Sequence, residues 1–201
     1  HTWRPTLETW NGEKSIQGLK NYYEGLGWSA GPHIFVAPDG IWLFTDMANV
    51  GIHAGAGNAT WEKNGKLYDG YYYSGATLKS YSIGIEIVGD YDEKVWEGAT
   101  LDNALGCISA LKNKLDIPIS DIKFHRDYSP KTCPGNAITR EWFEKKIQDY
   151  ENGTVIENGY DFKFSEAEAK RAQELGFLKQ IDTETREIIA IGLVRVYDRI
   201  K

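Results

Sequence analysis

The chain has 201 residues, with 23 lysines and arginines against 29 aspartates and glutamates, and a formal net charge of −6 at pH 7. This acidic balance argues against a nucleic-acid binder, which usually carries a basic stripe. No apolar run approaches the ~20 residues of a membrane-spanning helix, and the length suits one full domain plus a small appendage.

Glycine positions and the spacing of apolar residues predict the first elements of the chain. The sequence opens on His1 without a methionine, so we expect residues before it to be missing or removed. Residues 1–3 would be the end of a strand. From Gly12 to Gly25 apolar residues recur at intervals of three and four, which predicts a helix that Gly25 and Gly27 end.

Two apolar runs, 33–36 and 41–44, flank the turn Pro38-Asp39-Gly40 and predict a hairpin. The glycine-rich stretch from Val50 to about Ser80 is rich in tryptophan and tyrosine but has little periodicity, so we predict a long loop there. Its aromatic side chains would either stack on sugar faces or fold back as a small core of their own. The residues leave both interpretations open.

The later elements follow the same signals. Branched residues predict a strand over 81–88, and an apolar stripe predicts a helix over 100–115 with Thr100 as its N-cap. A short strand over 122–124 and a helix capped by Asn136 come next. We therefore predict a first domain over 1–150.

The C-terminal part of the chain is predicted to be a linker followed by a small helical module. Two Asn-Gly pairs mark a linker over 151–164, and two short helices are expected within 165–201. Acidic and basic residues balance from Asp161 onward, so charge alone would not hold this module to an anionic surface.

The stretch His125–Gly135 brings together groups that carry chemistry. Imidazole and thiolate, here His125 and Cys133, are ligands that zinc prefers, and a catalytic zinc keeps three protein ligands and an open position. A Cys–His nucleophilic pair is the other chemical interpretation, although this stretch shows no third group to orient it. Lys131 could stabilise an oxyanion. Alternatively, all three are ordinary loop residues.

Four more groups could join this stretch. His1, His33 and His53 each lie at or beside a predicted strand, which favours a shared site about as much as isolated structural roles. Glu86 lies on an apolar strand, where an unpaired carboxylate is costly to bury. Near a reactive water it would suit acid/base work, and at a strand edge it would simply face solvent.

The chain has two cysteines. Cys107 lies in a helical apolar pattern and is expected to be a small buried residue. A disulfide between Cys107 and Cys133 is the less favoured interpretation, because a thiol beside a histidine is better explained by metal binding or catalysis.

Five stretches, in this order, resemble the zinc-dependent N-acetylmuramoyl-L-alanine amidases of the type-2 group, which includes the peptidoglycan recognition proteins and phage amidase-type lysozymes. They fall within roughly residues 1–148. The stretches are His1-Thr2, Gly31–Val36 with Asp39-Gly40, Gly51–Gly55, Ser82–Gly89 and His125–Gly135.

The resemblance implies an α/β (α+β) fold, with a mixed central β-sheet flanked by helices and a surface groove that holds Zn²⁺. It implies that His125 and Cys133 are zinc ligands and that Glu86 is the acid/base of the bacterial and phage branch. It further matches Lys131 to a lysine implicated in transition-state stabilisation and His53 to a histidine lining the site.

Two departures from the family pattern affect the site. The first zinc ligand is usually the histidine of a His-x-Thr or His-x-Ser pattern, whereas His1 directly precedes Thr2, so that ligand is His1 or a residue before it. Some relatives carry a catalytic tyrosine where this chain has Pro32, which shifts the acid/base work to Glu86. The side chains expected to bind substrate are His33, His53, Trp61 and Tyr72.

The implied function is a zinc-dependent peptidoglycan hydrolase that cleaves the amide bond between N-acetylmuramic acid and L-alanine of the stem peptide. It would act as an endolysin or autolysin, either a phage-type lysin released to the host cell wall or a secreted, wall-associated enzyme. Its partner would be bacterial peptidoglycan, without nucleic acid and without a membrane span.

Two alternatives to this expectation stay open, and the C-terminal module has a resemblance of its own. A non-catalytic peptidoglycan-recognition protein is the first, although family members of that kind tend to lack the cysteine that Cys133 provides. A purely structural zinc is the second. The C-terminal helices are similar to surface-layer-homology-like wall modules, so they would bind the cell wall or mediate self-association.

Overall fold

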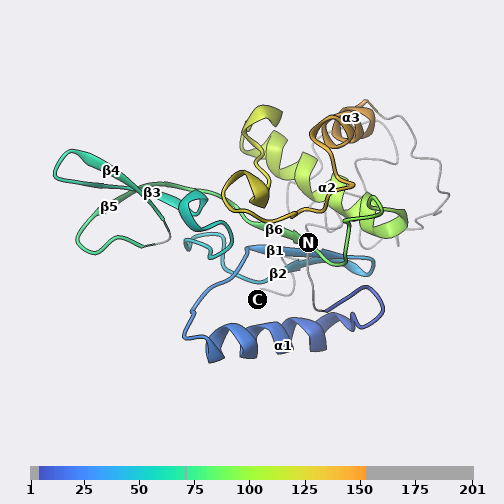
Figure 1. The fold of residues 1–201 in the computed structure, drawn as a ribbon, viewed down its shortest axis with the longest axis horizontal. Coiled ribbons are helices and arrows are strands. Elements are labelled where there is room, and N and C mark those ends of the chain that lie inside the picture. Colours follow the sequence, from blue (N-terminus) through green and yellow to red (C-terminus); the bar gives the residue numbers. More distant parts are fainter. Residues whose placement is uncertain (1–4, 71, 153–201) are drawn as a thin grey trace, which may run out of the picture. The chain divides into compact units, whose positions relative to one another are not determined.

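The computed structural model describes residues 5–70 and 72–152. Within them lie three α-helices, α1 (Gly12–Gly25), α2 (Gly98–Lys114) and α3 (Arg140–Glu151), together with six strands (Figure 1). The mixed α/β class predicted from the sequence is confirmed. The strand end expected at residues 1–3, the linker beyond residue 152 and the helical module over 165–201 lie outside the described residues.

The described strands form two three-stranded sheets. One has the order β2-β1-β6, and the other has the order β4-β3-β5. Their bounds are β1 (Ile34–Ala37), β2 (Gly40–Leu43), β3 (Ala59–Lys63), β4 (Lys66–Gly70), β5 (Thr77–Tyr81) and β6 (Ile85–Ile87). In this part of the chain, two small sheets replace the single central sheet that was expected.

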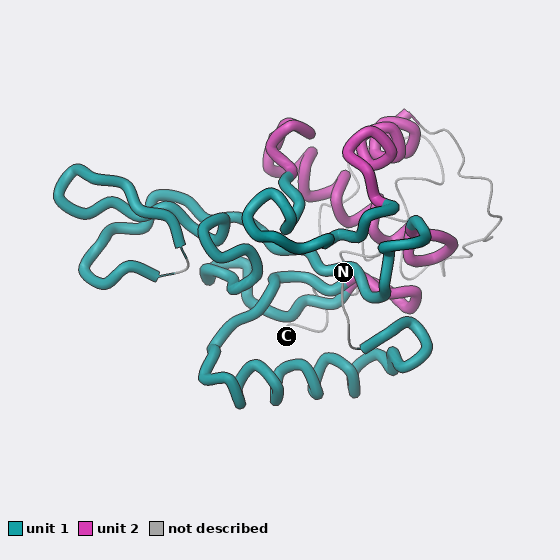
Figure 2. The backbone as a smooth tube through the Cα atoms, viewed as in Figure 1, with its two compact units in different colours: residues 1–35, 42–95, 123–137 teal, residues 36–41, 96–122, 138–201 magenta. Residues whose placement is uncertain are grey.

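Contacts along the backbone divide the chain into two compact units (Figure 2). The first comprises residues 1–35, 42–95 and 123–137, and the second comprises 36–41, 96–122 and 138–201. All the described residues predicted for the site belong to the first unit.

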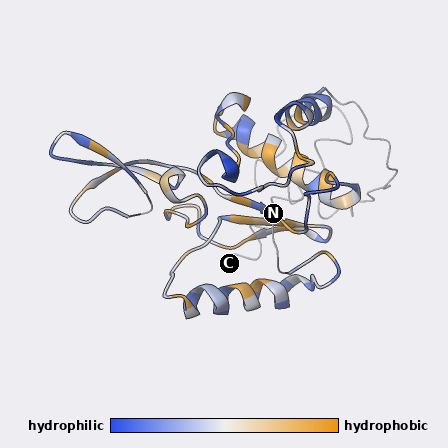
Figure 3. Ribbon diagram, in the orientation of Figure 1, coloured by the Kyte–Doolittle hydropathy of each residue, from blue (hydrophilic) through white to orange (hydrophobic). Residues whose placement is uncertain are grey.

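In the first unit, helix α1 packs against strand β2 and the residues just after it. Its amphipathic character is visible in Figure 3, and Ile16 is its buried residue. The Tyr23 ring meets Phe44 edge-on at 5.4 Å between centroids, and Trp10, just before the helix, meets Trp42 at 6.1 Å. The predicted helix bounds and the predicted hairpin are both confirmed.

The long loop predicted for residues 50–80 is wrong, because most of it is the sheet β4-β3-β5. Strands β3 and β4 pair antiparallel around Asn64 and Gly65, whose φ angles of 54° and 74° are those of a two-residue hairpin turn. An Asn-Gly pair is the strongest short-range hairpin signal, so this turn could have been recognised from the sequence. Of the aromatic side chains in this region, Trp61 is buried and Tyr72 is exposed, so both interpretations of them, stacking on sugars and packing as a small core, stay open.

Several predicted boundaries also need correction. The strand expected over 81–88 is reduced to β6, and residues 122–124 form no strand. Thr100 is buried inside α2, whose N-cap is Glu97. Thr139, not Asn136, caps α3, because its hydroxyl accepts a hydrogen bond from the Trp142 N–H at 3.1 Å.

In the second unit, α2 and α3 pack together. Trp96, just before α2, meets the Trp142 ring of α3 edge-on at 5.6 Å, and Lys112 pairs with Glu151 at 3.0 Å. Cys107 is buried in α2 as predicted, and burial raises its pKa to about 12. Cys107 and Cys133 are not joined by a disulfide. None of the described helices has the length and apolar character needed to cross a bilayer.

Candidate active site

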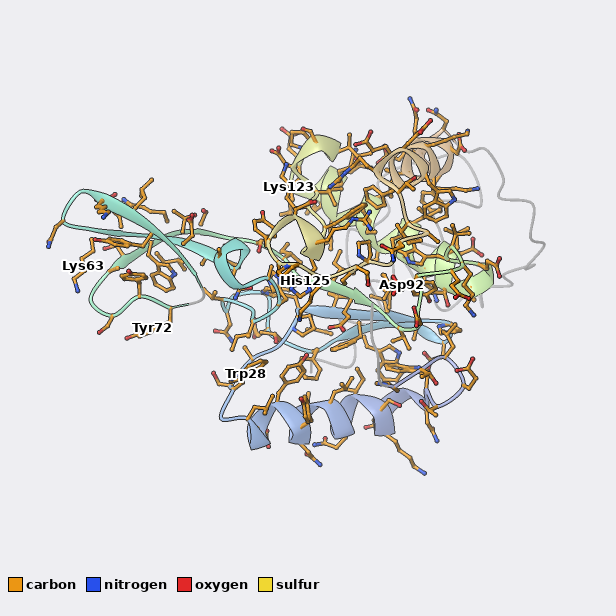
Figure 4. The ribbon with its side chains drawn as sticks, in the orientation of Figure 1. Trp28, Lys63, Tyr72, Asp92, Lys123 and His125 are labelled. Carbon is orange, nitrogen blue, oxygen red and sulfur yellow. The ribbon has the colours of Figure 1, made fainter. Side chains whose placement is uncertain are left out.

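The residues predicted to carry chemistry meet within the first unit. The charges of Cys133, His125 and Lys131 all act on the Glu86 carboxyl, and the side chains of His125 and Cys133 share a hydrogen bond. Figure 4 shows His125 among the side chains near the small sheet β2-β1-β6. Residues far apart in sequence are therefore gathered at one place.

Backbone contacts within the loop place His125 beside Cys133. The Arg126 N–H donates to the Cys133 carbonyl at 3.0 Å, and the Arg126 guanidinium donates to the Gly135 carbonyl at 2.9 Å. The Asp127 carboxylate accepts from the Phe124 N–H at 2.8 Å. Arg126 therefore joins the two ends of the loop, a role that spacing in the sequence does not predict.

Asp92 holds the same loop from outside. Its carboxylate accepts from the Thr132 hydroxyl at 3.2 Å and from the Asn136 N–H at 2.9 Å, on either side of Cys133. Gly135 lies so close to Tyr91 that a Cβ there would collide with the Tyr91 backbone. Sequence reasoning missed Asp92, because an aspartate in a turn resembles ordinary turn chemistry.

Glu86 has the properties of an acid/base group. It lies on β6 with only part of its surface exposed, and burial raises its pKa to about 7. The neighbouring Cys133 acts in the same direction, whereas His125 and Lys131 oppose the shift. A carboxyl with a pKa near the working pH can both accept and donate a proton.

Cys133 has increased thiolate character. Burial alone would raise its pKa, but interactions that include the hydrogen bond with His125 outweigh burial and bring the pKa below its ordinary value. A thiolate is both a metal ligand and a nucleophile. The Lys131 side chain is exposed, and its backbone N–H donates to the Ser129 carbonyl at 2.7 Å.

His33 and His53 form a pair, with ring centroids 5.7 Å apart. His33 is fully buried, its Nδ1 accepts from the Gly84 N–H at 3.0 Å, and its Nε2 donates to the Asn49 carbonyl at 3.0 Å. With Nδ1 accepting and Nε2 donating, the neutral imidazole is fixed in one tautomer. The substrate contact predicted for His33 stays a prediction, and the structure gives the residue a supporting place behind His53.

His53 is less enclosed than His33. Its Nε2 donates to the Ser82 carbonyl at 3.3 Å, and Gly84 lies against the ring so closely that a Cβ would collide with it. Burial, reinforced by the charge of His33, lowers the pKa of His53 to about 4. His53 is therefore neutral near pH 7.

The His33 environment predicts a pH-dependent stability. Burial lowers the pKa of folded His33 below its ordinary 6.5, so the unfolded chain binds more protons once the pH falls below that value. The neutral His33 therefore makes its full contribution to the free energy of unfolding above about pH 6.5, and this free energy falls as the pH is lowered below that value. Urea titrations at about pH 7 and about pH 5 should show a larger loss for the wild type than for His33→Gln, which removes the titratable imidazole and keeps a polar amide. Equal losses would contradict this account.

Trp61 and Tyr72 lie apart from the other predicted site residues. Both belong to the region of sheet β4-β3-β5, and Figure 4 shows Tyr72 well away from His125. Trp61 is buried, with its ring edge-on to Tyr72 at 6.0 Å, whereas Tyr72 is 66% exposed. If Tyr72 binds substrate, it therefore contacts a part of the substrate that lies away from the Glu86 carboxyl.

The donor set suits zinc as far as it is described. His125 and Cys133 supply one imidazole and one thiol in contact, which is the chemistry of a zinc site. Among the described residues no group of three metal-ligating side chains is present, and the predicted third ligand, His1, lies outside them. The zinc site stays a prediction.

Comparison with known proteins gives one match. A family model described as N-acetylmuramoyl-L-alanine amidase matches residues 1–136. No curated protein and no solved structure matches the chain.

Proposed function

The chain belongs to the N-acetylmuramoyl-L-alanine amidase family, and we propose that it hydrolyses the amide bond between N-acetylmuramic acid and L-alanine of the peptidoglycan stem. The family supports a role as a peptidoglycan amidase or recognition protein. The observation that favours hydrolysis is the Glu86 carboxyl, with a pKa raised to about 7, within electrostatic reach of His125, Lys131 and Cys133.

In the proposed mechanism, Glu86 takes a proton from the attacking water and later delivers it to the leaving amine of L-alanine. Lys131 stabilises the negative charge that develops on the carbonyl oxygen. His125, Cys133 and a third ligand at or before His1 would hold zinc, which when bound supplies Lewis acidity and lowers the pKa of a water toward ~7. Asp92 and Arg126 keep the loop in place.

A soluble N-acetylmuramoyl-L-alanyl peptide tests the proposal. Incubation with the protein should release a peptide with a free amino group on L-alanine, detected by chromatography and mass. The second candidate function is recognition without hydrolysis, which predicts binding of the same compound with no product. Cys133 favours the enzyme, because the thiolate would complete a metal site.

The biological setting is part of the proposal. We place the protein at the bacterial cell wall, as a phage-type lysin acting on the host or as a secreted, wall-associated autolysin. The C-terminal residues 165–201 would add wall targeting or self-association. Deletion from about residue 160 should lower wall binding or oligomer mass, and a truncated protein unchanged in both would remove this role.

Asp92 provides a prediction about loop positioning. Asp92→Ala removes the acceptors for Thr132 and Asn136, so we expect kcat/KM and zinc affinity to fall about 10–100-fold, as for other outer-shell partners. Asp92→Asn keeps one acceptor oxygen and should retain more of both. Isothermal titration with zinc and single-substrate kinetics would measure the effect. Wild-type values in Asp92→Ala would show that the loop does not depend on this carboxylate.

A further inference from the structure

The sheet β4-β3-β5, with its connection at residues 72–76, forms what we call the aromatic arm. Within the first unit, it extends away from the small sheet β2-β1-β6 (Figure 1). Its register places Trp61 opposite Tyr68 on β4 and Leu78 on β5, and Lys63 opposite Lys66. Because side chains alternate along a strand, these residues share one face of the arm.

The connection between β4 and β5 folds over this face. Tyr72 meets Trp61 edge-on, and the Tyr73 ring stacks on Tyr68 at 4.3 Å between centroids. The Lys63 ammonium donates to the Ser74 carbonyl at 2.9 Å and holds the connection in place. Trp61 is thereby enclosed, whereas Tyr72 is 66% and Tyr73 37% exposed. The rings of Tyr72 and Tyr73 on this face are therefore exposed to solvent, and the connection that carries them is held by the Lys63 hydrogen bond.

Charge is distributed unevenly between the two faces. The acidic residues of the arm, Glu62 and Asp69, lie on the opposite face, where Glu62 pairs with Lys79 at 2.6 Å and Asp69 accepts from Thr60 at 3.0 Å. The aromatic face carries Lys63 and Lys66, with Lys66 lying 5.3 Å from the centre of the Tyr68 ring. In a chain of net charge −6, this face is locally cationic.

The same face continues toward the candidate active site. Tyr81, at the end of β5, pairs with Ala59 in the register and stacks on His33 at 6.3 Å between centroids. Its hydroxyl donates to the Met47 carbonyl at 2.9 Å, which fixes the ring there. Aromatic side chains, namely Tyr81, Trp61 and Tyr68, therefore lie on one face of the arm, starting beside His33. The strands that carry them are each ~16 Å long.

From this aromatic face we propose that the arm is a second subsite, which binds the peptidoglycan glycan strand beyond the stem being cleaved. Tyrosine rings stack on the apolar faces of hexosamine sugars, because such rings combine an apolar face with a polar edge. Lys66 attracts the carboxylates of neighbouring stem peptides. The proposal rests on the proposed function, since it takes peptidoglycan as the substrate.

The test combines a long and a short substrate. Full-length Tyr72→Ala/Lys66→Ala should bind insoluble peptidoglycan about tenfold more weakly than the wild type. The loss of affinity for insoluble peptidoglycan should exceed any change in KM for the soluble muramoyl-L-alanyl peptide, because the proposed subsite takes the glycan beyond the stem being cleaved. Leu67→Ala is the matched control, since Leu67 lies on the opposite face of the same arm and is 60% exposed.

Tyr72→Phe separates a binding role from a folding role, because phenylalanine keeps the ring and should keep most of the wall affinity. Unchanged wall affinity in the double variant, or an equal loss in Leu67→Ala, would overturn the proposal. So would binding of the wild type to anionic phospholipid vesicles in preference to peptidoglycan. If the wild type binds the wall through the arm but cannot cleave the soluble peptide, the proposed function fails and the arm subsite stands.

Discussion

Glu86→Gln is expected to lower kcat about 10²–10⁴-fold, because the amide can neither accept nor donate the proton that hydrolysis requires. Glutamine has nearly the same volume, so the packing of β6 beside β1 should persist. The loss should appear in kcat on the soluble peptide, with little change in KM. Binding to insoluble peptidoglycan should equal that of the wild type.

Two controls make the Glu86 result specific. Glu62→Gln changes a carboxylate on the face of the arm opposite the aromatic side chains and should leave kcat unchanged, since the Glu62 carboxylate pairs with Lys79 on that face. Thermal unfolding should show that Glu86→Gln is folded. If Glu86→Gln retains wild-type kcat, the acid/base role assigned to this residue is incorrect.

Removal of metal is expected to abolish hydrolysis and to leave the fold intact. A chelator should eliminate activity, and added zinc should restore it. The far-UV circular dichroism should stay constant, with a modest fall in melting temperature because a bound ligand stabilises the folded state. A purely structural zinc predicts instead that chelation unfolds the domain.

Cys133→Ser tests the same metal site from the protein side. It should lose zinc and clearing of cell-wall suspensions, yet still be pulled down with peptidoglycan. Cys107→Ala is the matched control, because Cys107 is buried in α2 and outside the unit that carries the site. A Cys133→Ser protein that still clears suspensions and still holds zinc would exclude this residue as a ligand.

Local signals were sufficient where the structure depends on neighbouring residues. The interval of three and four between apolar residues predicted α1 with its observed bounds, Gly12–Gly25. The turn Pro38-Asp39-Gly40 predicted the hairpin of β1 and β2. Glu86 could be recognised as a candidate from the sequence, because a carboxylate between Ile85 and Ile87 is costly to bury without a partner.

Other features depend on contacts that the sequence does not display. Asp92 binds Thr132 and Asn136, which lie 40 and 44 residues further along the chain. The fixed tautomer of His33 likewise depends on Gly84, 51 residues away. Such pairings arise only after folding, so spacing could not reveal them.

The sheet β4-β3-β5 was missed for a different reason. Its glycines and clustered tyrosines suggested a loop, although the Asn64-Gly65 turn is a local hairpin signal. The edge strand β5 is exposed along its whole length, so it lacks the alternation of buried and exposed residues that identifies a half-buried strand. The composition of β5 therefore did not identify it as a strand, because its structure depends mainly on pairing with β3.

Mass spectrometry of purified peptidoglycan digested by the zinc-loaded protein tests the central claim most directly. We expect stem peptides that begin with a free L-alanine amino group, together with glycan strands whose muramic acid carries a free lactyl carboxylate. Glycan strands and stems that remain joined, or new sugar reducing ends in place of free L-alanine, would contradict the assignment of the protein as an amidase.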